Sequence, residues 1–323
     1  MMTRRHFLSA SAACLGCVSA GIAQAQTYPT RPITMIVPIG AGSISDVAGR
    51  IVVERMRVSL GQPIIIENVS GADGTIGTGR AARARPDGYT IDLGTTSHVL
   101  NAAFYSLPYD VLNDFTPIAP LVTNPVVLFA RRTMPAMNLN ELITWLKANP
   151  NKASAGITTV GFRLLNVFFQ NETGTQFTLV PYRGTPAVMQ DLLAGQIDLW
   201  FGSTDQLPLI RASSIKAYAV TSDTRSTFAP DIPTFAEMGL PALSYSVWVG
   251  IFAPKGTPKN IIDKLNAAAV DALADPAVRQ RLADLGSEVF PRDQQTAEAL
   301  GAIVKAGAEK WWPIIKASGI KAE

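Results

Sequence analysis

The chain of 323 residues has few of the residue types that most often carry catalysis or bind metals. It contains two cysteines and two histidines. Both cysteines, Cys14 and Cys17, lie near the N-terminus, and the chain beyond residue 25 has none. The absence of cysteine excludes disulfides, thiol catalysis and cysteine metal sites from that part of the chain. Only His98 remains after His6, which excludes a His-x-x-x-His zinc pair. A Ser-His-acid triad would have to use His98, and no Gly-x-Ser-x-Gly elbow supplies its serine.

Long apolar runs and a strong charge imbalance are also missing. Beyond residue 25, no window reaches the ~18 uncharged apolar residues that a membrane span needs. The formal net charge is +3 and falls to +1 without Arg4 and Arg5, and the basic residues are scattered. The sequence therefore offers no electrostatic footprint for nucleic acid, and we expect no nucleic-acid partner.

The first 25 residues have the composition of an export signal. Two arginines precede a weakly apolar stretch, and Ala23-Gln24-Ala25 has the small-x-small pattern of a secretory cleavage site. We expect residues 1–25 to be removed after Ala25, which places the mature protein in the periplasm. The run from Thr3 to Leu8, TRRHFL, matches the twin-arginine form of such signals, the alternative being an ordinary signal with two adjacent arginines.

The remaining chain alternates short apolar runs with helical patterns, which is typical of α/β folds with mostly parallel sheets. A first set of units contains strands predicted at 33–37, 62–67 and 89–94, with helices at 46–60 and up to residue 85. A second set begins near residue 125, with strands at 126–130, 153–155, 197–201 and 215–220. Two such blocks predict two lobes with a cleft between them, and ligands in α/β sheets bind beyond the carboxyl ends of strands.

A glycine-rich turn, IVPIGAGSISDVAGR, follows the first predicted strand at residues 36–50. One interpretation is a dinucleotide loop, because Gly40-x-Gly42-x-x-Ser45 opens a helix and Glu67 ends the next strand where a ribose-binding acid would lie. This alternative, an exported NAD(P)-dependent oxidoreductase, lacks the third glycine and an evident hydride-transfer constellation. The other interpretation is anion capture, in which backbone N–H groups and the positive end of the helix dipole hold a carboxylate.

Further candidate ligand contacts follow other strands. Ser43 and Ser45 either cap the helix or donate a hydroxyl to the ligand, and Asp46 is expected to hold an amine, a water or the facing loop. Arg163 lies in the first turn of a helix, where a cation opposes the dipole; a second ligand carboxylate or a surface ion pair would explain it. We expect His98 to point into the cleft mouth or to form a hydrogen bond with a loop carbonyl. The full candidate site is Pro38, Ile39, Gly40, Ala41, Gly42, Ser43, Ser45, Asp46, Thr95, Thr96, Ser97, His98, Ala155, Gly156, Thr158, Thr159 and Arg163.

Ordered stretches along nearly the whole mature chain resemble the Bug-type periplasmic receptors of tripartite tricarboxylate transporters. The matching stretches include YPTRPITMIVPIGAGSISDVAGR, GQPIIIENVSGADGTIG, PDGYTIDLGTTS, LPYDVLNDFTPIA, VPYRGTPAVMQDLLAGQIDLWF and VWVGIFAPKGTP. The resemblance implies a two-lobed, Venus-flytrap fold of type II-like periplasmic binding proteins, with a ligand cleft between the lobes. It implies one lobe of residues 27–124 plus 245–323 and another of residues 125–244.

The same resemblance implies a monomeric receptor, not an enzyme, that needs no cofactor or metal and delivers a small carboxylate to membrane permease subunits. A sensing role, with a kinase as the genomic neighbour, is the remaining alternative. In the family, the loops matching residues 38–46 and 155–161 grip one ligand carboxylate, partly through ordered water.

This sequence departs from the family pattern in both loops. Ile39-Gly40-Ala41-Gly42-Ser43 stands where members usually have Phe-Ala-Pro-Gly-Gly, and the second loop carries Ile157, Val160 and Phe162 where small or polar residues are common. These apolar residues lead to the hypothesis that the ligand is a hydrophobic carboxylate, such as the aromatic dicarboxylate terephthalate, rather than citrate.

Overall fold

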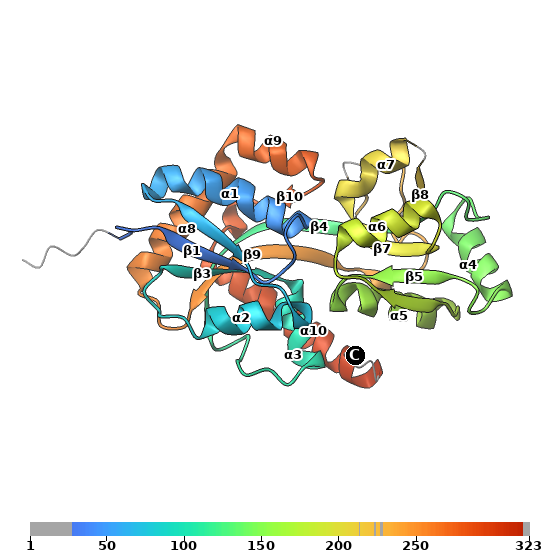
Figure 1. Cartoon of the computed structure of the whole chain (residues 1–323), viewed down its shortest axis with the longest axis horizontal. Helices are drawn as coiled ribbons and strands as arrows, with labels where there is room; N and C mark the ends of the chain where they lie inside the picture. The colour runs from blue at the N-terminus through green and yellow to red at the C-terminus, as the bar shows by residue number, and fades with distance from the viewer. Residues whose placement is uncertain (1–27, 213, 223, 227–228, 319–323) are drawn as a thin grey trace, which may run out of the picture.

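The computed structural model describes residues 28–212, 214–222, 224–226 and 229–318. The expected export signal therefore lies outside the described residues. None of the helices in the described ranges is both long and apolar enough to cross a membrane. The described chain forms a two-lobed α/β structure (Figure 1).

The first lobe is built on a group of parallel strands. β1 pairs on its two sides with β2 and β3, in a register that places Ile33 beside Ile64 and Thr34 beside Thr90. β9 and then β4 continue the sheet in antiparallel orientation. These strands are β1 (Ile33–Val37), β2 (Ile64–Asn68), β3 (Thr90–Thr95), β4 (Phe115–Arg131) and β9 (Ser246–Pro254).

The strand β4 belongs to both lobes. Its first part pairs with β9 up to Pro125, and its last part, from Val126 to Arg131, pairs with β7 and β8. The parallel strands β5 and β6 extend the second lobe beyond β7, whereas the short β10 pairs with β4 in the first. The bounds are β5 (Ser154–Ile157), β6 (Thr178–Pro181), β7 (Leu199–Ser203), β8 (Ile215–Val220) and β10 (Glu288–Val289). One sheet therefore runs through the whole molecule (Figure 1).

Three prolines explain the irregular pairing of β4. The register against β9 shifts after Pro117 and again after Pro120, and pairing passes to the second lobe after Pro125. Proline has no N–H group to donate to a ladder, so it occurs at bulges and at the ends of pairing. The strand can therefore continue while its partners change.

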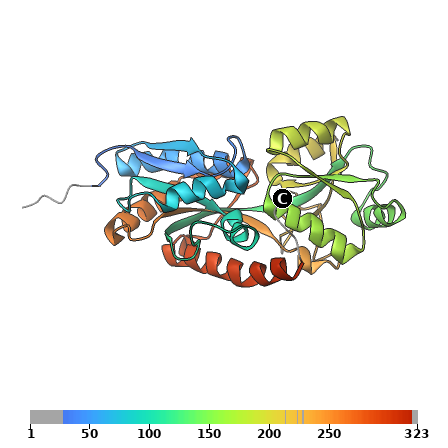
Figure 2. The same cartoon turned by 60° about the horizontal axis from the view of Figure 1, so that its bottom comes forward.

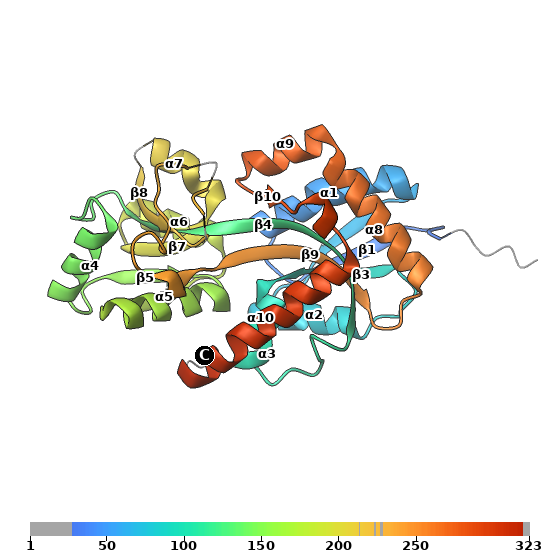
Figure 3. The same cartoon turned by 180° about the vertical axis from the view of Figure 1, so that it is seen from behind.

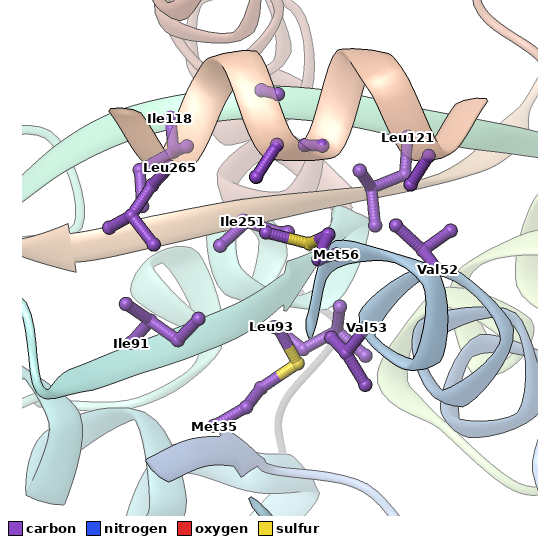
Figure 4. Packing of buried hydrophobic residues seen from close by; sticks show 14 of the residues in the cluster. Met35, Val52, Val53, Met56, Ile91, Leu93, Ile118, Leu121, Ile251 and Leu265 are labelled. Carbon is purple, nitrogen blue, oxygen red and sulfur yellow. The ribbon is translucent and has the colours of Figure 1, made fainter. Parts of the chain in front are cut away.

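Helices cover both sides of the first lobe's sheet. α1 (Ile44–Leu60) and α8 (Lys259–Ala274) share one core, in which Val52 and Met56 lie among Leu93, Ile251 and Leu265 (Figure 4). The remaining helices of this lobe are α2 (Thr75–Ala82), α3 (Thr96–Phe104), α9 (Pro276–Asp284) and α10 (Ala297–Ser318). In the second lobe they are α4 (Leu139–Ala148), α5 (Val160–Thr173), α6 (Thr185–Ala194) and α7 (Leu207–Arg211).

The C-terminal helix α10 ties the two lobes together. Leu300, in its first part, is buried in a core of the first lobe, and Trp311 and Ile315 join the core of the second. The Trp311 ring centroid lies 6.1 Å from that of Phe168 on α5 and 5.7 Å from that of Tyr245. Figures 2 and 3 show α10 extending from beneath the first lobe toward α5.

The two-lobed α/β prediction is confirmed, but the expectation of mostly parallel sheets is wrong for the centre of the molecule. β3, β9, β4 and β7 are successive antiparallel neighbours. The sequence patterns also missed the first half of β4, because its prolines resemble loop signals. They also predict no helix at α3, because the polar residues Thr95-Thr96-Ser97 directly follow a predicted strand and carry no apolar periodicity.

The substitution Leu265→Ala should destabilise the first lobe strongly. The side chain is fully buried between α8 and the sheet, and removing it should lower the free energy of unfolding by about 2–5 kcal/mol. Val58→Ala is the matched control because Val58 is 66% exposed, and we expect a change within about 0.5 kcal/mol. Urea unfolding of the two variants measures the difference; equal losses would contradict the described core.

Candidate functional site

A cavity of about 420 Å³ lies between the glycine-rich turn of the first lobe and two elements of the second. The second lobe contributes α6 and the short helix η2 (Thr204–Gln206). The lining residues combine an apolar wall with several polar groups and are Gly42, Thr185, Pro186, Met189, Gln190, Leu193, Asp205 and Gln206. The cavity is therefore positioned to hold a small ligand in contact with both lobes.

Asp46 holds the first loop in place. Its Oδ2 accepts hydrogen bonds from the backbone N–H of Gly42 at 2.9 Å and from Arg50 Nε at 3.0 Å, while its Oδ1 accepts from Asn68 Nδ2 at 2.9 Å. Asn68 Nδ2 also donates to the carbonyl oxygen of Ile39 at 3.2 Å. Burial raises the pKa of Asp46, but the hydrogen bonds from Arg50, Asn68 and Gly42 outweigh it, so the pKa lies below its ordinary value. Asp46 is thus an ionised clamp on its own loop.

One backbone N–H group of the glycine-rich turn, which the sequence predicts to bind the ligand, is already hydrogen-bonded to Asp46. The Gly42 N–H already donates to Asp46, and Ser43 caps α1 by accepting from the Asp46 N–H at 3.3 Å. Gly40, Ala41 and Gly42 are exposed and Ile39 is half-buried, whereas Pro38 and Ser45 are buried. Of these eight candidate residues, Gly42 alone is among those that line the cavity.

The residues from Thr95 to His98 make their hydrogen bonds to other parts of the first lobe. Thr95 caps α3, and the Thr96 hydroxyl donates to the carbonyl oxygen of Ser246 at 3.2 Å and accepts from the Trp248 N–H at 3.0 Å. These bonds tie α3 to β9. Ser97 is half-buried, and none of the four lines the cavity.

The expectation that His98 lies at the cleft mouth or on a loop carbonyl is wrong. Its Nδ1 accepts from the Thr95 N–H at 3.1 Å, so in the neutral ring Nε2 carries the proton. Nε2 lies 2.6 Å from Asp92 Oδ2 and 3.2 Å from the Thr78 hydroxyl. The His98 side chain is 5% exposed and that of Asp92 is fully buried. Both ring nitrogens of His98 therefore form their hydrogen bonds inside the first lobe.

The second predicted loop is packed into its own lobe. Thr158 and Thr159 are half-buried, and Thr159 caps α5 by accepting from the Phe162 N–H at 3.3 Å. Ala155 and Gly156 are buried, and a Cβ on Gly156 would lie 2.3 Å from Val188 of α6. Gly156 therefore permits β5 and α6 to approach each other closely.

Arg163 lies close enough to the end of α3 for its charge to affect Tyr105. Burial raises the pKa of Tyr105, at the end of α3, as does its 2.6 Å hydrogen bond to Asp73, while the charge of Arg163 lowers it. Arg163 is not among the residues that line the cavity.

Comparison with known proteins identifies the family. Residues 48–320 match the model described as the tripartite tricarboxylate transporter family receptor. The chain belongs to this family. Protein BugT of Bordetella pertussis is 34% identical over 316 residues, which cover 94% of this chain and 95% of BugT.

Solved structures of family members have the same fold. The periplasmic binding protein BugD is 37% identical, with a TM-score of 0.85 over 92% of this chain and 100% of that one. MatC from Rhodopseudomonas palustris, solved with bound malate, is 34% identical, with a TM-score of 0.83 over 89% of this chain and 100% of its own. The chain is therefore a receptor of the solute-binding type with the periplasmic binding protein fold.

Several cavity residues were missed from the sequence. Met189, Gln190 and Leu193 belong to α6 and line the cavity, and Leu193 is 48% exposed. Asp205 and Gln206 follow β7, and the rule that ligands bind beyond strand ends had already marked that turn. Within the described residues, no group of three or more His, Asp, Glu or Cys side chains is placed to hold a metal.

Gly42 should tolerate a side chain poorly, and Gly40 should accept one. A Cβ meets no atom within 4 Å at either position, but Gly42 has a φ of +79°, which suits glycine. We expect Gly42→Val to lower the free energy of unfolding by about 1–2 kcal/mol from backbone strain alone. Gly40→Val is the control and should change it little. Chemical unfolding compares the two, and an unaffected Gly42→Val would contradict the left-handed turn.

Removing the ring of His98 should damage stability. His98→Ala leaves the buried Asp92 carboxylate without its partner, which should lower the free energy of unfolding by about 3–5 kcal/mol. Ser97→Ala, one residue away and half-buried, is the control. A loss no larger than that of the control would show that the pair with Asp92 contributes little.

Proposed function

We propose that this protein captures a small carboxylate with an apolar body in the periplasm and delivers it to the permease subunits of a tripartite tricarboxylate-type transporter. The observation that carries the proposal is the cavity that joins the two lobes of a receptor fold. Family membership over most of the chain supports the transport role, and the malate bound in MatC supports a carboxylate ligand.

The N-terminus of α6 supports carboxylate binding. Gly184 provides no side-chain cap for α6, Pro186 occupies its first turn, and Thr185 and Pro186 line the cavity. The first N–H groups of a helix have no intrahelical partner, and they favour an anion. A ligand carboxylate at this end of α6 would face the exposed turn of residues 40–42, with the rest of the loops at 38–46 and 155–161 holding it through water.

The apolar wall of the cavity supports a ligand with a hydrophobic part. The residues that form this wall differ from the apolar residues of the second loop that the sequence predicts for this role. Ile157, Val160 and Phe162 are buried within the second lobe, so they cannot form an apolar rim. Pro186, Met189 and Leu193 of α6 line the cavity instead. Terephthalate therefore remains a better candidate than citrate, because a compact aromatic body would bury this wall.

Binding would act through closure of the lobes. The lobes proposed are residues 27–124 with 245–323, and residues 125–244, joined by β4, the segment before β9 and α10. A ligand in contact with both lobes raises the closed population by its differential affinity for the closed form, which the permease would recognise. We propose a monomer, exported with cleavage after Ala25, that acts as a receptor and not as an enzyme.

The oxidoreductase alternative has less support from the site. Glu67, the candidate ribose acid, forms an ion pair with Arg80 at 2.6 Å. The Gly42 N–H that a dinucleotide phosphate would use donates to Asp46. A sensing role would use the same binding site with a different partner.

Native mass spectrometry of protein purified from its own host should reveal a bound carboxylate by its mass. In a thermal-shift series, terephthalate should then raise the unfolding temperature more than citrate does, and Gly42→Val should lose that ligand-induced shift. Gly239→Val, which introduces a side chain at a similar positive φ of +82° but at a residue that does not line the cavity, should retain it. Stabilisation by small polar acids alone would contradict the hydrophobic ligand, and a bound nicotinamide cofactor would contradict the receptor.

A further inference from the structure

A closed ring of three hydrogen-bonded side chains supports the glycine-rich turn of the first lobe. Asp46 Oδ2 accepts from Arg50 Nε at 3.0 Å, Arg50 Nη2 donates to Asn68 Oδ1 at 2.7 Å, and Asn68 Nδ2 donates to Asp46 Oδ1 at 2.9 Å. Asp46 and Arg50 belong to α1, whereas Asn68 is the last residue of β2. The ring therefore joins the helix that follows the turn to a neighbouring strand of the sheet.

The ring holds the turn at two points. The Gly42 N–H donates to Asp46 Oδ2 at 2.9 Å, and Asn68 Nδ2 donates to the carbonyl oxygen of Ile39 at 3.2 Å. Residues 40 and 41, between these two points, are exposed, and Gly42 lines the cavity. The conformation of the segment beside the cavity is therefore set by contacts at both of its ends.

Asn68 is the member of the ring that an isosteric residue cannot replace. Its Nδ2 donates to two acceptors, and its Oδ1 accepts from Arg50, so the amide uses both of its polar atoms. An aspartate would present a carboxylate oxygen to Asp46 and to the Ile39 carbonyl, and two attractive contacts would become repulsive. Because the Asp46 side chain is 2% exposed, water screens that repulsion poorly.

We propose that Asn68 is a positioning residue for ligand binding, which acts through Asp46 and Ile39 on the turn at the cavity. This inference rests on the proposed function, since it concerns how one wall of the same cavity keeps its shape. A turn that already has its bound conformation loses no backbone freedom when the ligand binds, whereas a loosened turn has to be ordered at the expense of affinity. The affinity of the receptor therefore depends on a residue that does not line the cavity.

Exchanging the amide and the carboxylate between positions 46 and 68 tests the ring itself. In Asn68→Asp, two carboxylates face each other. In Asp46→Asn, the new amide presents its NH2 group either to Asn68 Nδ2 or to the donors of Gly42 and Arg50. In the double variant, the oxygen at position 46 accepts from Gly42 and Arg50, and the nitrogen donates to the carboxylate at position 68. Of the ring and turn contacts, the double variant loses the one to the Ile39 carbonyl, so it should recover most of what each single variant loses.

Isothermal titration calorimetry on the mature protein, with terephthalate, adipate and malate as probes, measures the effect on binding. For each acid that binds the unaltered protein, Asn68→Asp and Asp46→Asn should each weaken binding about tenfold or more, which is the entropic cost of ordering about one further backbone residue. The double variant should bind more tightly than either single variant. Independent, additive effects of the two substitutions cannot produce that result.

Asn266→Asp is the matched control. Asn266 Nδ2 of α8 also donates to two carbonyl oxygens in the first lobe, those of Ile118 at 2.8 Å and Gln295 at 2.9 Å, but Asn266 does not line the cavity. The substitution should lower the free energy of unfolding and leave the affinity unchanged. Urea unfolding of every variant then shows whether the loss of affinity follows the ring or only the loss of stability.

Hydrogen exchange at the Gly42 amide, measured by NMR on protein labelled with 15N-glycine, is a second readout that needs no ligand. The Gly42 N–H donates to a buried carboxylate, so its exchange should be slow in the unaltered protein, faster in each single variant and slow again in the double variant. The Gly61 N–H, which donates to the Arg57 carbonyl at 2.9 Å at the other end of α1, should exchange at the same rate in all of them.

The outcomes separate the two proposals. Affinity for a bound acid that is unchanged in Asn68→Asp, or that falls as much in Asn266→Asp, would overturn the positioning role while leaving carboxylate capture intact. A double variant that binds no better than the single variants, or a Gly42 amide that exchanges equally in all of them, would also overturn it. Failure of all three acids to bind the unaltered protein would count against carboxylate capture itself, and the inference would fall with it.

Discussion

The continuity of β4 is the constraint on which the rest of the structure depends. One strand of seventeen residues supplies pairing partners to the sheets of both lobes, so neither sheet is complete without it. Its prolines let the partners change from β9 to β7 and β8 without breaking the chain. Asn124, just before the change, is buried and accepts a 2.6 Å hydrogen bond from Ser287. The same strand thus fixes how the Gly42 turn faces α6, and with it the existence of the cavity.

The first loop illustrates how a helix N-terminus can be satisfied without a ligand. Its sequence offers glycine, serine and exposed N–H groups, which are the parts of an anion site. In the fold, the carboxylate of Asp46 accepts from the Gly42 N–H and is itself held by Arg50 and Asn68. This arrangement satisfies the Gly42 N–H within the loop itself. The uncapped N-terminus of α6 and the side chains of η2 face the same cavity.

The sequence predicted the fold well where local periodicity and capping agree. α1 begins two residues before its expected start at residue 46, and the strands expected at 126–130, 153–155, 197–201 and 215–220 lie near their expected positions. The site was harder to predict because the side chains concerned are polar in either role. Thr96 and His98 have the composition of ligand contacts, but their partners, Ser246, Trp248 and Asp92, are brought together only by the folded sheet. Which face of α6 remains exposed likewise depends on the position of the facing lobe, which local patterns do not encode.

Contacts between the lobes restrict the motions that binding can use. Trp311 packs on Phe168, and the Thr204 hydroxyl donates to the carbonyl oxygen of Gly286. These contacts join the lobes outside the cavity wall, so a closing motion has to keep or exchange them while α6 approaches the Gly42 turn. A ligand shifts this equilibrium only through interactions that differ between the open and closed forms. In the proposed closure, burial of the apolar α6 wall would increase as the lobes approach, whereas the hydrogen bonds of Asp46 lie within one lobe and would be the same in both forms. The selectivity of closure would therefore come from the wall of the second lobe.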